Sequence, residues 1–192
     1  MQLKNLTTNF LGRNSIFYKR IDSTQDEIWR RLKKGNINNG TLVMADIQEF
    51  GRGTHGRVWH TDEEKNIAFS FLIEPNCNIN KIEGLTTDIA KIILNILKDE
   101  YKIELEIKKP NDLIYHGKKI GGILTETKLV SEKVKYLVIG IGINTSKMQF
   151  TDDIKNIATS IKKEFELEID AQEFIAKFCN KFEKYILERI EK

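Results

Sequence analysis

The segment from Tyr136 to Ile143, which reads YLVIGIGI, constrains the fold more than any other part of the chain. It is the longest apolar run, yet it is far shorter than the roughly 20 residues that a bilayer-spanning helix needs. The run therefore predicts a buried β-strand and argues against a membrane span. Gly140 and Gly142 weaken such a strand, so they mark either a strand irregularity or a place where a ligand or another backbone comes close.

The length of 192 residues and the hydrophobic content of 40% fit one globular domain. The net charge is only +3, and residues 1–60, although more basic than the rest, lack the strong basic stripe of proteins that bind duplex DNA. A small polyanion such as a nucleotide phosphate fits this mild excess. The N-terminus has no apolar signal-peptide core, and Cys77 and Cys179 form no motif, so we expect a cytoplasmic protein with free thiols.

Hydrophobic periodicity predicts short strands, mostly in pairs, with helices interspersed. Ser23 or Thr24 is expected to cap the first helix, and Glu27 to complete a capping box. This order favours an α+β fold with a mixed, largely antiparallel sheet over a doubly wound fold. Strands are expected at residues 15–21, 41–47, 66–73, 103–107 and 136–143, with a hairpin at 113–124, and helices at 22–35, 81–101, 153–164 and 170–191.

A glycine-rich loop follows the second strand and reads GRGTHGR from Gly51 to Arg57. Its three glycines let the backbone approach a ligand closely and offer N–H groups to an anion. Arg52 and Arg57 add charge suited to phosphate or carboxylate. The spacing matches neither a dinucleotide-binding fingerprint nor a P-loop. The alternative interpretation is a mobile surface loop with ordinary turn glycines.

Two lysine clusters lie close to the predicted hairpin. One comes before the turn that leads into the hairpin, and the other follows the turn inside it. Lys108 and Lys109 end one strand, and Lys118 and Lys119 begin the returning strand. If the clusters meet on one rim, their ammonium groups would counter the charge of a phosphoryl group; otherwise they form a solvated turn. Asn144, after the buried strand, either binds a heterocycle or ends the strand. The three histidines have no metal-ligand spacing, so no zinc site is expected.

Taken together and in this order, these segments resemble the catalytic domain of biotin protein ligases, which has a class II aminoacyl-tRNA synthetase-like fold. The resemblance covers about residues 15–146, and residues 150–192 read as a helical tail. The matching elements are Asp22-Ser23-Thr24, Gln48, Gly51-Arg52-Gly53, Gly56-Arg57-Val58-Trp59, Asn66-Ile67, Lys108-x-Pro110-Asn111-Asp112, Lys119-x-x-Gly122-Ile123-Leu124-x-Glu126 and Gly140-x-Gly142-Ile143-Asn144.

The resemblance implies a two-step reaction. The carboxylate of biotin attacks the α-phosphate of ATP, with cations and Mg²⁺ offsetting the repulsion between the two anions, and biotinyl-AMP and pyrophosphate form. A lysine of a biotin carboxyl carrier protein, as in acetyl-CoA carboxylase, then attacks the mixed anhydride and releases AMP. A loop that orders over the intermediate would shield it from water. The resemblance implies a monomer or a homodimer, with neither DNA nor a membrane as a partner.

The resemblance also implies roles for individual residues. Lys108 stands at the position of the catalytic cation, Arg52 lines the carboxylate and phosphate side, and Asp112 would help to place Mg²⁺ or the incoming lysine. The implied biotin contacts are Ser23, Thr24, Gln25, Gln48, Arg52, Gly53, Thr54, Lys119 and Gly122. The implied ATP or adenylate contacts are Gly51, Arg52, Arg57, Trp59, Asn111, Lys119, Gly140, Gly142 and Asn144, with Asn144 facing adenine.

Two residues depart from the family pattern. Thr54 stands where the family often has an arginine that helps to retain the adenylate, so we expect weaker retention. Lys109 stands where the family usually has tryptophan, so packing under Lys108 must differ. No segment reads as the helix-turn-helix domain or the C-terminal β-barrel of many relatives, so we expect one domain over residues 1–192 that is not a repressor.

Three other functions compete with biotin ligation. Lipoate ligases and octanoyl transferases share a related fold and acyl-transfer chemistry. A non-catalytic module that binds biotin or a nucleotide is a second alternative, because Thr54 and Lys109 leave room for lost turnover. Nucleic-acid binding by the basic first third is a third, and a flat salt dependence would exclude it.

Overall fold

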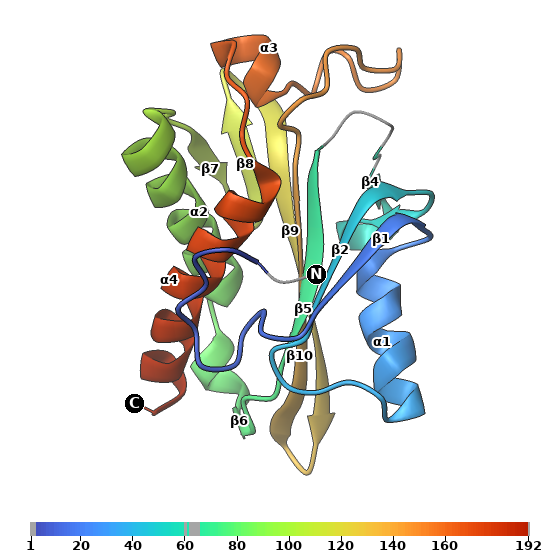
Figure 1. Cartoon of the computed structure of the whole chain (residues 1–192), viewed down its shortest axis with the longest axis vertical. Coiled ribbons are helices and arrows are strands. Elements are labelled where there is room, and N and C mark those ends of the chain that lie inside the picture. The colour runs from blue at the N-terminus through green and yellow to red at the C-terminus, as the bar shows by residue number, and fades with distance from the viewer. Residues whose placement is uncertain (1–2, 60, 62–65, 192) are drawn as a thin grey trace.

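The computed structural model describes residues 3–59, 61 and 66–191, and an eight-stranded sheet forms its centre (Figure 1). Among the described strands, β1 and β2 pair in parallel and the other pairs are antiparallel, which confirms the predicted mixed, largely antiparallel sheet. The order is β1-β2-β5-β10-β9-β8-β7, with β6 paired to β10. The strands are β1 (Ser15–Ile21), β2 (Leu42–Gln48), β5 (Ile67–Ile73), β6 (Cys77–Asn78), β7 (Glu106–Lys108), β8 (Asp112–Tyr115), β9 (Lys118–Val130) and β10 (Lys133–Ile143).

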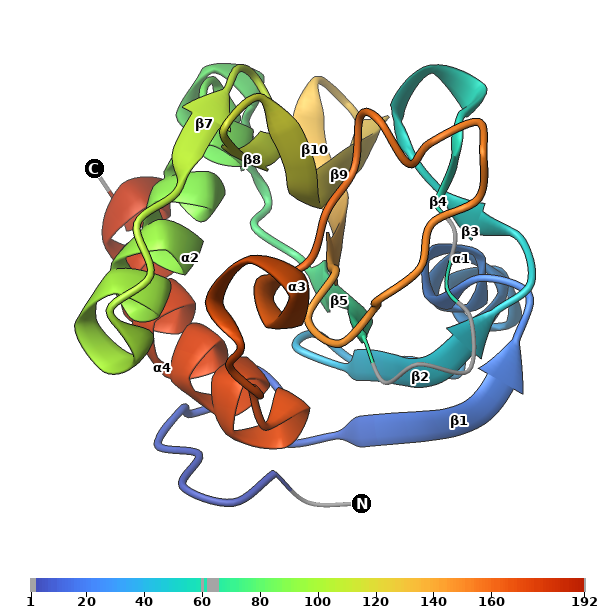
Figure 2. The ribbon, with the colours of Figure 1, turned by 90° about the horizontal axis from the view of Figure 1, so that it is seen from above.

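The helices cover the two faces of the sheet unequally. Helices α2 (Leu85–Tyr101) and α4 (Ala171–Glu191) lie along one face, and α1 (Thr24–Lys34) lies on the other (Figures 1 and 2). The short helix α3 (Ile161–Phe165) lies at one end of the sheet. A separate two-stranded pair, β3 (Gly51–Arg52) and β4 (Val58–Trp59), flanks the 3₁₀ turn η1 (Thr54–Gly56), and a second 3₁₀ turn, η2 (Ile79–Ile82), precedes α2.

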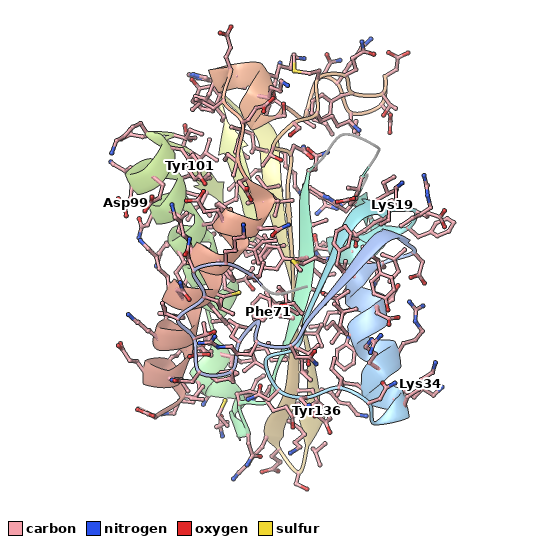
Figure 3. All side chains as sticks on the ribbon, in the orientation of Figure 1. Lys19, Lys34, Phe71, Asp99, Tyr101 and Tyr136 are labelled. Carbon is pink, nitrogen blue, oxygen red and sulfur yellow. The ribbon has the colours of Figure 1, made fainter. Side chains whose placement is uncertain are left out.

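The main core lies between the sheet and the helices α2 and α4. Phe69 and Phe71 of β5 point to this side, and their rings lie 5.6 and 5.3 Å from those of Phe178 and Phe182 of α4, in edge-to-face contact. Phe71 lies near the middle of the molecule in Figure 3. The predicted apolar face of the last helix is therefore confirmed, and it packs in the core rather than on a surface.

The opposite face has a much smaller core, beneath α1. It consists of Ile28, Val43, Leu72 and Val138, all fully buried. Side chains alternate along a strand, so Gly140 and Gly142 lie on the same face of β10 as Val138 but carry no side chain. The sheet is therefore hollowed there.

One local expectation is confirmed and two need correction. Of the two residues expected to cap α1, Ser23 is the cap: its Oγ accepts from the backbone N–H of Asp26 at 3.3 Å, and Thr24 is the first helical residue. Glu27 does not complete a capping box, because its carboxylate accepts from Tyr18 and from two arginines of its own helix. Helix α2 begins at Leu85 rather than at residue 81, since η2 occupies the preceding turn.

The predicted helix over residues 153–164 is wrong for most of its length, because only residues 161–165 are helical. The backbone of this segment pairs instead with Lys119 at the start of β9. The N–H of Lys119 donates to the carbonyl of Ile157 at 2.8 Å, and the N–H of Thr159 donates to the carbonyl of Lys119 at 2.9 Å. The strand predicted at 103–107 is likewise displaced to Glu106–Lys108, because the N–H of Ile103 closes the end of α2.

Both cysteines are buried free thiols, as expected, and burial raises the pKa of Cys179 to about 12. Within residues 3–59 and 66–191, no helix combines the length and apolar character that crossing a membrane requires.

Phe178→Ala should lower the free energy of unfolding by about 3–5 kcal/mol, because it leaves a cavity among three other phenylalanine rings. Urea denaturation followed by circular dichroism measures this change. Leu167→Ala, at an exposed apolar position, is the control and should change stability by less than about 0.5 kcal/mol. Equal effects of the two substitutions would contradict this assignment of the core.

Candidate active site

Two adjoining cavities lie over the hollowed part of the sheet. The first, which we call the amide pocket, opens over β10 and β9, and its space of about 430 Å³ is partly open to solvent. The second, the aromatic pocket, lies between β4 and the segment that joins β10 to α3, and its space of about 740 Å³ is also partly open to solvent. In Figure 2 that segment, in orange, arches toward β4 on the side of the sheet that carries α1. Gly53, Thr54, Trp59 and Lys119 line both cavities, so the two are continuous.

Polar side chains at one end of the amide pocket bond to one another. The N–H and the Oγ1 of Thr24 lie 2.8 and 2.9 Å from Oε1 of Gln48, which accepts from both. The Thr24 hydroxyl also lies 2.8 Å from the hydroxyl of Ser70 on β5. All three residues are buried, and Thr24 is placed by the first turn of α1, directly after the cap at Ser23. The capping geometry thus directs the start of α1 into the pocket.

Gln25 has a fixed amide orientation. Its Nε2 donates to the carbonyl of Val138 at 3.2 Å and to Oε2 of Glu126 at 3.0 Å, so both N–H groups are used. Its Oε1 is buried and has no hydrogen-bond partner among the described residues. This oxygen lies over Gly140, where an added Cβ would be only 2.7 Å away. The pocket therefore presents an acceptor that requires a donor from a ligand.

Arg52 projects from β3 toward two carboxylates. Its Nη2 lies 2.6 Å from Oε1 of Glu126, and its Nη1 lies 2.9 Å from Oδ1 of Asp26. Burial alone would lower the pKa of Arg52, but the charges of Glu126 and Asp26 outweigh it and raise that pKa above its ordinary value. The guanidinium thus stays charged at the mouth of the amide pocket.

The indole of Trp59 lies against the strands between the two cavities. An added Cβ at Gly142 would be 2.4 Å from this ring, and one at Gly122 would be 3.5 Å from it. The ammonium of Lys119 lies 5.7 Å from the ring centroid on a line suited to a cation–π contact. The indole Nε1 is buried without a partner in the part of the chain that the structure describes. Only glycine at position 142 leaves room for this ring.

Lys119 stands where the two cavities meet, and its Nζ lies 2.6 Å from Oδ1 of Asp112. Lys108, Asp112, Gly122 and Gly142 pair in one row across four adjacent strands, so they lie on the same face of the sheet. Lys108 is exposed at the outer end of this row and lines neither cavity.

The aromatic pocket combines ring faces, apolar side chains and cations. Trp59 and Phe150 supply the rings, and Arg57, Lys119 and the buried Lys147 supply the charges. Its far wall is the segment whose backbone pairs with Lys119. Residues 153–160, which the sequence predicted to be helical, therefore form this wall in an irregular conformation. Asn144 also lines this pocket, and its Nδ2 donates to the carbonyl of Thr159 at 3.1 Å.

Most of the site residues expected from the sequence lie together at the two cavities. Those that line the amide pocket are Thr24, Gln25, Gln48, Arg52, Gly53, Thr54, Trp59, Asn111, Lys119, Gly122, Gly140 and Gly142. Arg57 and Asn144 join the aromatic pocket. Four others line neither cavity: Ser23 caps α1, Gly51 pairs with Trp59, Asp112 holds Lys119, and Lys108 is exposed.

Sequence reasoning missed several residues of the site. Ser70 could have been found as the one hydroxyl inside an otherwise apolar strand. Glu126 belonged to a matched motif, yet its contacts were not foreseen. Lys147 and Phe150 lie in an irregular segment without periodicity, so no local signal pointed to them.

The described residues do not fit a metal ion held by the protein. They contain no group of three histidine, cysteine, aspartate or glutamate side chains that could hold one. Asp112, the residue expected to place Mg²⁺, has a lysine ammonium at 2.6 Å from its carboxylate. We therefore derive no step through a protein-bound metal.

Comparisons with known proteins agree with this architecture. The fold is that of the class II synthetase-like domain of biotin protein ligases: the structure of "Biotin protein ligase from Aquifex aeolicus in complex with biotin and ATP" superposes with a TM-score of 0.74 at 32% identity, covering 94% of this chain and 71% of that one. Residues 17–144 match the biotin/lipoate A/B protein ligase family, close to the expected range of 15–146. The chain belongs to this family.

Curated relatives are longer than this chain. The bifunctional ligase/repressor BirA of Bacillus subtilis is 35% identical over 181 residues, which cover 93% of this chain and 55% of that protein. The human biotin–protein ligase is 26% identical over 194 residues, 96% of this chain and 27% of that protein. The chain thus spans about half the length of the bacterial relative and about a quarter of the length of the human one.

Gly142→Ala should displace the Trp59 indole, because the new methyl group would overlap a rigid ring. We expect a loss of about 1–3 kcal/mol in stability and a red-shifted emission of Trp59, measured in a Trp29→Phe background where it is the single tryptophan. Gly122→Ala is the matched control, because its methyl group would meet the flexible end of Lys119 at 3.2 Å. An unshifted spectrum for Gly142→Ala would refute the placement of the indole.

Proposed function

We propose that this chain is a ligase that joins biotin to AMP at the expense of ATP and then transfers the biotinyl group to a lysine of a carrier protein. One observation carries the proposal: a pocket for a small polar head group opens into a second pocket for a ring and phosphates, with Lys119 where they meet. Two substrates bound end to end would bring their reacting groups to this junction.

The amide pocket suits the ureido ring of biotin. The unpaired Oε1 of Gln25 would accept from a ureido N–H, and the hydroxyl oxygen of Ser70, whose proton goes to Thr24, can accept from a second donor. The bound carboxylate would then extend toward Lys119 and Arg52. A cation at that point stabilises the negative charge that develops as the carboxylate attacks the α-phosphate.

The aromatic pocket suits the adenosine part of ATP. A flat heterocycle would bind in the cavity that Trp59 and Phe150 line, and Asn144 would offer it a polar edge. Arg57 and Lys119 lie on the side where phosphates would extend. The Asp112 carboxylate, 2.6 Å from the Lys119 ammonium, orients that ammonium.

Transfer to the carrier requires access to the mixed anhydride from outside. Lys108 ends β7 on the same row as Asp112 and Gly122 and is exposed, so it would offer a cation where an acceptor lysine approaches. In this proposal Lys108 supports the second step or the departing phosphate. Mg²⁺ would enter with the triphosphate of ATP as part of the substrate.

The same observations favour biotin over lipoate. Lipoate has no hydrogen-bond donor in its ring, so its binding would leave the buried Oε1 of Gln25 without a partner, at a cost of about 1–3 kcal/mol. A carrier protein of the acetyl-CoA carboxylase type and a cytoplasmic setting belong to the proposal, and the two free, buried thiols are compatible with a reducing compartment.

Mass spectrometry of a biotin carrier domain, incubated with this chain, ATP, Mg²⁺ and biotin, tests the proposal. We expect a biotinyl group on one lysine of the carrier, and no lipoyl group when lipoate replaces biotin.

Lys119→Met should slow biotin-dependent pyrophosphate release by about 10²-fold or more, because it removes a preorganised cation from the reacting centre. Lys135→Met, on the remote part of β10, is the control and should be neutral. A lipoylated carrier, or tight biotin binding without pyrophosphate release, would overturn the proposal.

Thr54→Arg should slow the dissociation of biotinyl-AMP. Thr54 lines both cavities, where the family often has arginine, and its hydroxyl accepts from Arg57 at 2.9 Å. A second guanidinium there would add a charge-assisted contact to the phosphate, which corresponds to about tenfold slower release. Rapid dilution of the preformed complex, with release followed over time, measures the rate. A variant that releases the adenylate as fast as the unchanged chain would contradict the expected weak retention.

A further inference from the structure

Glu126 lies on β9, outside both cavities, yet it contacts three residues from two other segments, α1 and β3. Its Oε2 accepts from Gln25 Nε2 at 3.0 Å and from the indole N–H of Trp29 at 2.8 Å, and its two oxygens accept from Arg52 at 2.6 and 3.2 Å. Three quarters of its side-chain surface is buried. One carboxylate therefore joins α1, β3 and β9 at the edge of the amide pocket.

The carboxylate has a specific effect on Gln25. An amide can be reversed in a pocket, with its oxygen and nitrogen exchanged. Here reversal would set the Gln25 oxygen against two acceptors, Glu126 Oε2 and the Val138 carbonyl, and would leave two N–H groups facing the pocket. Glu126 and the Val138 carbonyl together thus make the buried, unpaired atom over Gly140 an acceptor.

We infer that Glu126 is a positioning residue that makes the amide pocket selective for a ligand with an N–H donor and at the same time holds the arginine of the glycine-rich loop over that pocket. The inference rests on the proposed function, because it names the ureido N–H of biotin as the donor. Glu126 does not touch the ligand, and it acts through Gln25 and Arg52. Asp26, by contrast, contacts Arg52 but not Gln25.

A double-mutant cycle on biotin binding, measured by calorimetry without ATP, tests the first part. Gln25→Leu and Glu126→Leu should each weaken binding about tenfold, because each removes the oriented acceptor. The double variant should lose much less affinity than the two single losses multiplied together, since both remove the same oriented acceptor; the remaining difference from Gln25→Leu alone is the part that Glu126 exerts through Arg52. Lys135→Met, on the remote part of β10, is the control and should leave biotin affinity within about twofold of the unchanged chain.

Exchanging the two side chains guards against a purely structural effect. Gln25→Glu alone places two carboxylates together and should weaken biotin binding at least about tenfold. Gln25→Glu combined with Glu126→Gln removes the charge repulsion, but it sets a carboxylate oxygen at position 25 against the Val138 carbonyl and an amide N–H at position 126 against the Trp29 N–H, so affinity should recover only in part and stay below that of the unchanged chain. Both variants keep the side-chain volumes nearly unchanged, and a thermal unfolding measurement on each checks that it folds.

The outcomes separate this inference from the proposed function. If the unchanged chain binds no biotin, both fall. If it binds biotin but the two Leu substitutions multiply fully in the double variant, or the exchanged pair binds no better than Gln25→Glu, then Glu126 does not orient the pocket, while the ligase proposal stands. Near-equal affinity for biotin and for an analogue methylated at both ureido nitrogens would likewise overturn the inference.

Discussion

The site depends on one constraint, the alternation of side chains along β10. Leu137, Ile139 and Ile141 face the large core, and that packing fixes the register and orientation of the strand. Gly140 and Gly142 must then face the other way, and they leave the volume that Gln25 and Trp59 occupy. A shift of one residue would place apolar side chains in the pocket, so the core determines the cavity floor from the opposite face of the sheet.

The second organising feature is that the cations of the site are held by nearby carboxylates. Arg52 lies between Asp26 and Glu126, and Lys119 is paired with Asp112. Such pairs at partly exposed positions contribute little to stability, so their main effect is on orientation. They hold the Lys119 ammonium at the junction of the cavities and the Arg52 guanidinium at the mouth of the amide pocket before any anionic ligand is present, which reduces the ordering cost of binding.

Sequence patterns were most informative in two cases: where apolar residues recurred along a long helix, and where a glycine stood at a position that has no room for a side chain. The apolar face of α4 and the buried strand around Gly140 and Gly142 were predicted correctly for these reasons. The resemblance to a family brought distant segments to one site, which no local pattern could do. The segment over 153–160 was predicted wrongly because its structure is set by backbone pairing with Lys119, a long-range contact that leaves no periodicity in the side chains. The hydrogen bonds of Glu126 were missed for a similar reason: they join three segments that are distant in sequence.

The backbone pairing between Lys119 and the segment before α3 has an evolutionary consequence. Main-chain hydrogen bonds do not depend on which side chains the segment carries, so mutations between Met148 and Ile157 can accumulate while both attachment points persist. The lining of the aromatic pocket can therefore change without disturbing the neighbouring amide pocket, whose residues come from rigid strands and from the first turn of α1.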